Sequence, residues 1–133
     1  MQPSTESFDA DDVQSFLNSY GVALSTGDLD AIGESYDFPA LVVEASGSVL
    51  LADPEAVRES TADVARGFRE RGLVGVVARL VQVEEVGDAL VWAHVRWSYR
   101  DENANEQEAQ EVRYLLRRAR DTFEVCVAAP LAS

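Results

Sequence analysis

The chain has 133 residues, enough for one domain, and 47% of them are hydrophobic, which excludes general disorder. Its 24 acidic residues outnumber its 11 basic residues, all of them arginine, and give a net charge of −13. This excess of acid argues against partners such as nucleic acid or an anionic membrane, because both need clustered positive charge. A lysine-free, acidic composition is typical of a GC-rich genome or of adaptation to high salt, and both interpretations stay open.

The N-terminus has neither the basic nor the apolar region of a signal peptide, and we expect residues 1–8 to form a flexible tail. No apolar run approaches the ~18 residues that a transmembrane helix needs. The single cysteine, Cys126, allows no intrachain disulfide and is expected to be an inert core thiol. We therefore expect one cytoplasmic domain over residues 1–133.

Two helices are predicted in the first forty residues. The apolar positions from Val13 to Leu24 have the i, i+3, i+4 spacing of a helix, and Gly27 is a suitable end for it. Asp28 is then a good N-cap for a short second helix, which Pro39 would close. The buried face of this second helix is expected to carry Leu29, Ile32 and Tyr36.

A β-hairpin and a third helix are expected next. Residues 40–45 and 49–51 have strand character, and residues 46–48 are suited to a turn. Asp53 and Pro54 are typical of the N-cap and first position of a helix, and Gly72 is suited to its end. The predicted buried stripe of this helix is Val57, Thr61, Val64 and Phe68.

The second half of the chain predicts four strands, over residues 73–86, 89–100, 112–120 and 123–129. Short polar turns join them, so neighbouring strands must be antiparallel. Together with the three helices, this order predicts an α+β fold with helices on one face of the sheet.

Two of these strands are apolar on both faces. The strand at 89–100 directs Trp92 to one face and Trp97 to the other. The strand at 73–86 is expected to direct Val81 and Val83 to one face and Val76 and Leu80 to the other. Because the helices can cover one face only, we expect a second copy of the chain to cover the other, in a homodimer through the sheet.

The order of elements resembles the NTF2-like superfamily, which includes SnoaL-like cyclases and ketosteroid isomerases. The resemblance covers nearly the whole chain and is carried by Phe16-Leu17, Tyr20, Gly27-Asp28-Leu29-Asp30-Ala31-Ile32, Tyr36 and Pro39. It implies a cone-shaped, cystatin-like fold, with three N-terminal helices packed on a curved, mainly antiparallel sheet around a pocket. The residues expected to line that pocket are Phe16, Tyr36, Trp92 and Tyr114.

The ketosteroid isomerases of this family use a tyrosine, a carboxylate base and a protonated aspartic acid. By resemblance, the first two positions fall on Tyr20 and Glu44, and the third falls near Arg113 or Tyr114. Neither candidate for the third position is a carboxylic acid, which argues against steroid isomerisation itself. A proton-transfer reaction with Glu44 as base stays open.

The candidate catalytic residues are Glu44, Tyr20 and His94, and each has a structural alternative. Glu44 interrupts an apolar strand, where burial would make it a usable base, or it lies on the exposed face. Tyr20 lies on the buried stripe of its helix, as a hydrogen-bond donor or as a core aromatic. His94, the single histidine, is a general acid or base if its face lines the pocket, and a structural residue if that face is the dimer interface.

Three functions follow from these residues. The chain is a cofactor-independent isomerase, cyclase or dehydratase, a non-catalytic binder of a small molecule, or a dimeric interaction domain. One histidine and one cysteine do not build a usual metal site, no cofactor motif is present, and the absence of lysine excludes Schiff-base chemistry. The acidic residues fall mostly in caps, turns and polar faces, which favours a neutral, largely apolar small molecule over an anionic one.

Overall fold

A computed structural model describes residues 10–131, so the predicted tail at residues 1–8 lies outside the described residues. The helices are α1 (Ala10–Thr26), α2 (Leu29–Glu34) and α3 (Pro54–Glu70). The strands are β1 (Tyr36–Glu44), β2 (Gly47–Leu51), β3 (Gly75–Val86), β4 (Leu90–Arg100), β5 (Glu106–Ala119) and β6 (Thr122–Pro130).

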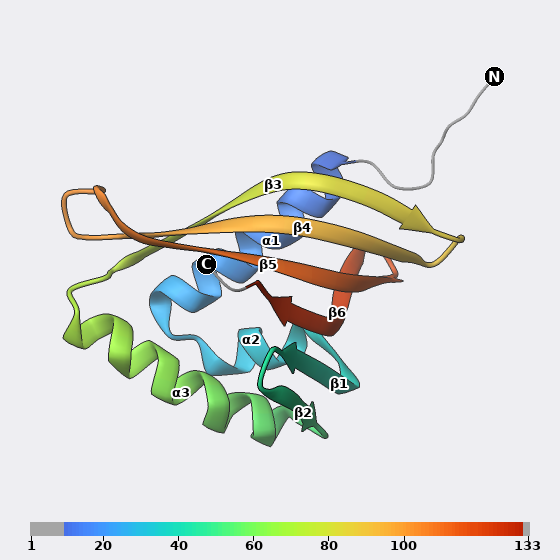
Figure 1. Cartoon of the computed structure of the whole chain (residues 1–133), viewed down its shortest axis with the longest axis horizontal. Coiled ribbons are helices and arrows are strands. Elements are labelled where there is room, and N and C mark those ends of the chain that lie inside the picture. Colours follow the sequence, from blue (N-terminus) through green and yellow to red (C-terminus); the bar gives the residue numbers. More distant parts are fainter. Residues whose placement is uncertain (1–9, 132–133) are drawn as a thin grey trace.

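The strands form one curved sheet in the order β2-β1-β6-β5-β4-β3. All neighbours are antiparallel except β1 and β6, which are parallel. Figure 1 shows the long strands β3, β4 and β5 arching over α1, while α2, α3 and the β1–β2 hairpin close the other side. The predicted α+β fold, with helices on one face of a mainly antiparallel sheet, is confirmed.

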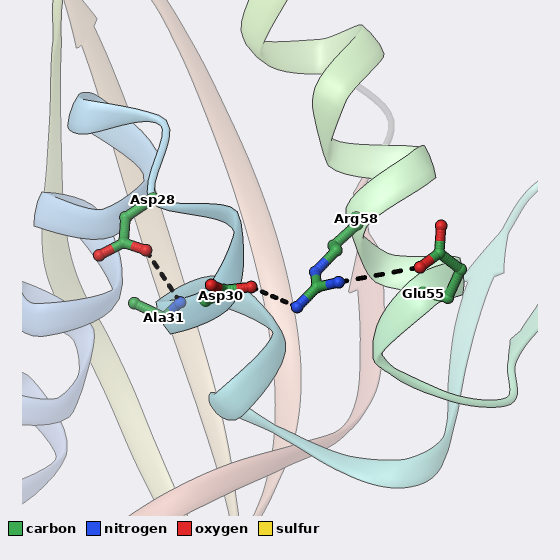
Figure 2. Close-up of polar contacts among 5 residues, drawn as sticks. All are labelled: Asp28, Asp30, Ala31, Glu55 and Arg58. Atoms are coloured by element: carbon green, nitrogen blue, oxygen red, sulfur yellow. Dashed lines mark hydrogen bonds and ion pairs between the residues drawn. The ribbon is translucent and has the colours of Figure 1, made fainter.

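Two aspartates cap the helices as predicted. The Asp28 carboxylate accepts a hydrogen bond from the Ala31 N–H at the start of α2, and Asp53 accepts one from the Ala56 N–H at the start of α3. Figure 2 shows the first cap, and also shows Arg58 of α3 reaching the carboxylates of Asp30 and Glu55. The ion pair between Arg58 and Asp30 links the start of α3 to α2.

The predicted second helix is too long. It ends at Glu34, and Tyr36 begins strand β1 instead of continuing the helix. The Val125 N–H of β6 donates to the Ser35 carbonyl, so pairing with a strand distant in sequence overrides the local helical spacing. Pro39 consequently lies inside β1 rather than at the end of a helix.

Two further expectations need correction. Val64 of α3 is 49% exposed, although we expect it on the buried stripe, because α3 packs on α2 and β2 rather than on the middle of the sheet. Strand β3 has a bulge between Leu80 and Gln82 that reverses its alternation. Val83 therefore packs towards the core with Leu80, not on the opposite face.

Strand β5 begins at Glu106 rather than Val112, because its acidic first half pairs with β4. The Arg96 guanidinium makes two hydrogen bonds to the Glu106 carboxylate, both of 2.8 Å, and His94 Nε2 lies 2.6 Å from a Glu111 oxygen. The hydrogen bonds from Arg96 lower the pKa of Glu106 to about 2. Cross-strand charge pairs thus extend a strand whose sequence has turn character.

The core lies between α1 and the inner face of the sheet. Its fully buried side chains include Trp97 and the residues Val13, Leu17, Val91, Val95 and Leu116. Within residues 10–131, no helix is long and apolar enough to cross a membrane.

Candidate functional site

A cavity of about 200 Å³ opens between α1, α3 and the inner face of the sheet. All four tyrosines of the chain line it, and they come from four different elements: Tyr20 (α1), Tyr36 (β1), Tyr99 (β4) and Tyr114 (β5). The rest of the lining is Leu24, Val42, Ser60, Thr61, Val64, Phe68, Trp97, Gln110, Val112, Ala128 and Pro130. Since a dry apolar cavity of about 150 Å³ holds benzene, this volume suits a ligand of about one ring.

The hydroxyls of Tyr20 and Tyr36 meet at 2.7 Å on one wall. The helical spacing of α1 directs Tyr20 inwards, and the early start of β1 brings Tyr36 against it. Burial raises the pKa of both phenols, strongly for Tyr20. Both side chains therefore keep their protons at neutral pH and act as hydrogen-bond donors.

A second pair lies on the sheet. The Trp97 indole N–H donates to the Tyr114 hydroxyl oxygen at 2.8 Å, and the Tyr20 ring packs edge-on against both rings. Burial raises the pKa of Tyr114 well above its usual value. Burial also raises the pKa of Tyr99 to about 12, and its hydroxyl donates to Gln110 Oε1 at 3.2 Å.

The hydroxyl protons of this cavity are not all used. Tyr20 and Tyr36 have two protons, and the hydrogen bond between them uses one. Tyr114 accepts from Trp97, and among the hydrogen bonds of the described residues none takes the Tyr114 proton. The cavity thus offers two O–H donors on apolar walls, an arrangement suited to an uncharged ligand that carries hydrogen-bond acceptors.

The predicted catalytic residues do not converge on this cavity. Tyr20 lines it, but Glu44 is exposed at the end of β1, two residues beyond the lining residue Val42 on the same face of the strand. His94 lies on the outer face of the sheet beside Glu111. The geometry expected of an isomerase with Glu44 as base is therefore not formed.

The predicted pocket residues divide in the same way. Tyr36 and Tyr114 line the cavity. Phe16 lies deeper in the core, stacked on Tyr20, and is not part of the lining. Trp92 lies on the outer face, where the Arg113 guanidinium packs over its ring, because alternate residues of β4 point to opposite sides of the sheet.

Strand alternation in β5 also separates Arg113 and Tyr114, the two residues that the resemblance offers for the third position. Tyr114 points into the cavity, whereas Arg113 points outwards. Trp97, Tyr99 and Phe68 also line the cavity, although none of them is among the predicted pocket residues. Trp97 and Tyr99 point to the same, inner face of β4 as Val95, and the period of two along the strand could have identified them once the inner face was known.

A second, wider hollow of about 670 Å³ lies between α2, the start of α3 and β1. Arg58 and Asp30 line this hollow, and Figure 2 shows the ion pair between them, which joins the two helices. Tyr36 contributes to both hollows and so forms part of the wall between them. Among residues 10–131 no group of three or more His, Cys, Asp or Glu side chains could hold a metal ion.

Comparison with known proteins identifies relatives of the fold. The model of a family described as NTF2-like protein (DUF6841) matches residues 10–133. A solved NTF2-like protein of unknown function from Shewanella oneidensis MR-1 is 13% identical, with a TM-score of 0.68, covering 91% of this chain and 97% of its own. An NTF2-like protein with a cystatin-like fold from Novosphingobium aromaticivorans is 13% identical, with a TM-score of 0.67, covering 92% and 80%.

A third structure, from Catenulispora acidiphila DSM 44928, is a hypothetical protein with a ketosteroid isomerase-like fold in complex with trimethylamine. It is 16% identical, with a TM-score of 0.56, and the match covers 89% of this chain and 85% of that one. No curated protein matches the chain. At these identities the structural neighbours show the fold alone.

Proposed function

Because the chain belongs to the NTF2-like family DUF6841, whose fold encloses its cavity, we propose that it binds a small, neutral, largely apolar molecule between α1, α3 and the sheet. The observation that carries this proposal is the lining itself. Four tyrosines, Trp97 and Phe68 supply apolar walls and hydroxyl donors. This combination is what small-molecule sites generally use.

Binding is favoured over turnover by what the lining contains. Among the described residues that line the cavity, none has a carboxylate, imidazole or guanidinium group. Proton transfer needs a base within hydrogen-bond reach of the substrate, and Glu44 and His94 lie elsewhere. We therefore propose a binder, in preference to an isomerase, cyclase or dehydratase.

Charge supports a neutral ligand. The net charge of −13 repels anions, and a cavity without an ionised lining residue gives an anion no partner. A structural neighbour of this chain is in complex with trimethylamine, which supports small-molecule binding, though not ligand neutrality, within this fold.

The test compares acetophenone, a neutral ring with one acceptor, with benzoate, an anion of similar size. Acetophenone is expected to stabilise the protein against heat by about 2.7 kcal/mol at a hundred times its Kd, and benzoate is expected to have no effect. The Glu44→Gln variant should respond as the wild type does. Equal stabilisation by both compounds, or by neither, contradicts the proposal.

A matched pair of variants locates the binding. Val64 is exposed at the opening of the cavity, and a Val64→Trp substitution should block it. Val22, 62% exposed on α1, is not a lining residue, so Val22→Trp is the control. Acetophenone should stabilise the control and not the Val64 variant. If both variants respond alike, the ligand binds outside the cavity.

We also propose a homodimer through the outer face of the sheet. That face carries Trp92 and the exposed Val77, and the charges of Arg96 and Glu106 on it balance one another. Two chains with a charge of −13 each repel one another, and a face with balanced charges weakens that repulsion. Light scattering coupled to size exclusion should give twice the 14.5 kDa chain mass, and a monomer mass contradicts this proposal.

A further inference from the structure

Strand β3 lies at one edge of the sheet, and within residues 10–131 no strand lies on its outer side. It is the second-longest strand, and it carries exposed valines, among them Val77 and Val81. An edge of this kind has unpaired N–H and C=O groups that a second chain can use to extend the sheet. The outward-facing backbone groups of β3 nevertheless have hydrogen-bond partners.

Helix α1 supplies them with two side chains. The Val76 N–H donates to Ser25 Oγ at 2.9 Å. The Leu80 N–H donates to Gln14 Oε1 at 3.0 Å, and Gln14 Nε2 donates to the Ala78 carbonyl at 3.1 Å. The Gln14 carboxamide thus presents one donor and one acceptor to β3, as a peptide group of a neighbouring strand would.

The alternation of an antiparallel pair shows that these are the edge groups. Along β3, successive residues direct both backbone groups either towards β4 or away from it. Val76, Ala78 and Leu80 bond to α1 side chains and so face away, which leaves Val77 and Arg79 to pair with β4.

Helix α1 also lies too close for a strand to enter. A side chain on Gly21 would place its Cβ 3.1 Å from the Val76 carbonyl oxygen, so the helix backbone rests directly against the edge. Beyond Leu80, the bulge in β3 bends the strand, and Glu84 and Glu85 add negative charge there. Bulges and charges are devices that discourage pairing at an edge.

We infer that α1 takes the place of a neighbouring strand for β3 and blocks edge-to-edge pairing with a second copy of this chain. Gln14 and Ser25 are the residues that do this. Copies of the chain must then associate through another surface.

Residue-resolved amide hydrogen exchange tests the inference. In the wild type, the amides of Val76 and Leu80 should exchange as slowly as that of Val77, although their N–H groups point away from β4. Gln14→Ala should speed exchange at Leu80 at least tenfold and leave Val76 unchanged, and Ser25→Ala should do the reverse. Wild-type amides of Val76 and Leu80 that exchange as fast as those of the 101–105 turn, or variants without these local effects, overturn it.

Two controls separate the contact from general destabilisation. Gln14→Glu keeps an acceptor for the Leu80 N–H, so Leu80 should stay protected in that variant. Gln107→Ala removes an exposed glutamine that bonds to Asp101 and not to Val76 or Leu80, and should change neither amide. The α1 backbone still covers the edge in the Gln14→Ala, Ser25→Ala double variant, so its mass in light scattering should equal that of the wild type. Larger assemblies of the double variant contradict the part assigned to the helix backbone.

Discussion

Tyr114→Phe removes one oxygen atom from the cavity and leaves the ring in place. In the wild type, the hydroxyl of Tyr114 accepts the indole N–H of Trp97, which is 2% exposed. The variant leaves this buried donor without its acceptor, and an unpaired buried donor costs about 1–3 kcal/mol. In a domain of this length that is a fall in Tm of about 4–12 °C.

Urea unfolding measures this cost directly, and the m-value should stay unchanged because the surface exposed on unfolding is the same. Tyr99→Phe is the matched control, because the Tyr99 hydroxyl donates to the exposed Gln110 at 3.2 Å and leaves no buried donor behind. The control should lose less than about 0.5 kcal/mol. A Tyr114 variant as stable as the Tyr99 variant refutes the reasoning.

Three further results are expected. Burial raises the pKa of the tyrosines, to about 12 for Tyr99, so the unfolded chain loses these protons at a lower pH than the folded chain. The free energy of unfolding should therefore fall as pH rises from about 10 to 12, by about 1.4 kcal/mol per pH unit for each tyrosine. Urea unfolding at pH 8, 10 and 11 checks this, and a constant free energy of unfolding contradicts it. Gly21→Ala should be destabilising overall, because the cost of about 1–3 kcal/mol from a Cβ that lies 3.1 Å from the Val76 carbonyl oxygen outweighs the gain of about 1 kcal/mol in helix propensity. A variant that needs the wild-type urea concentration or more to unfold argues against this close contact. Asp53→Ala should cost about 1 kcal/mol through the lost cap of α3, and unchanged thermal unfolding would speak against that role.

Local signals predicted most of the fold. The helix caps at Asp28 and Asp53 and the antiparallel order of the last four strands depend on nearby residues, and the structure agrees with them. The errors arise where distant residues decide. Tyr36 leaves the helix because β1 pairs with β6, and the first half of β5 is a strand because its glutamates meet arginines and a histidine of β4.

The candidate site was only partly predictable for the same reason. The family resemblance and the helical spacing led to Tyr20, Tyr36 and Tyr114, which line the cavity. Whether Trp92 or Trp97 faces inwards depends on which side of β4 the helices cover, and strand alternation alone does not fix that choice. Glu44 interrupts an apolar run in the sequence. It is exposed to solvent because β1 extends beyond the cavity and Glu44 is its last residue.

The central claim, that the tyrosine-lined cavity takes a neutral ligand, is tested most directly by the two tryptophan indoles. Trp97 lines the cavity and bonds to Tyr114, whereas Trp92 lies on the outer face of the sheet. In a titration with acetophenone followed by nitrogen–proton correlation spectra, the Trp97 indole signal should shift in a saturable way and the Trp92 signal should stay in place. A Trp97 signal that does not move, or two signals that move together, contradicts the account.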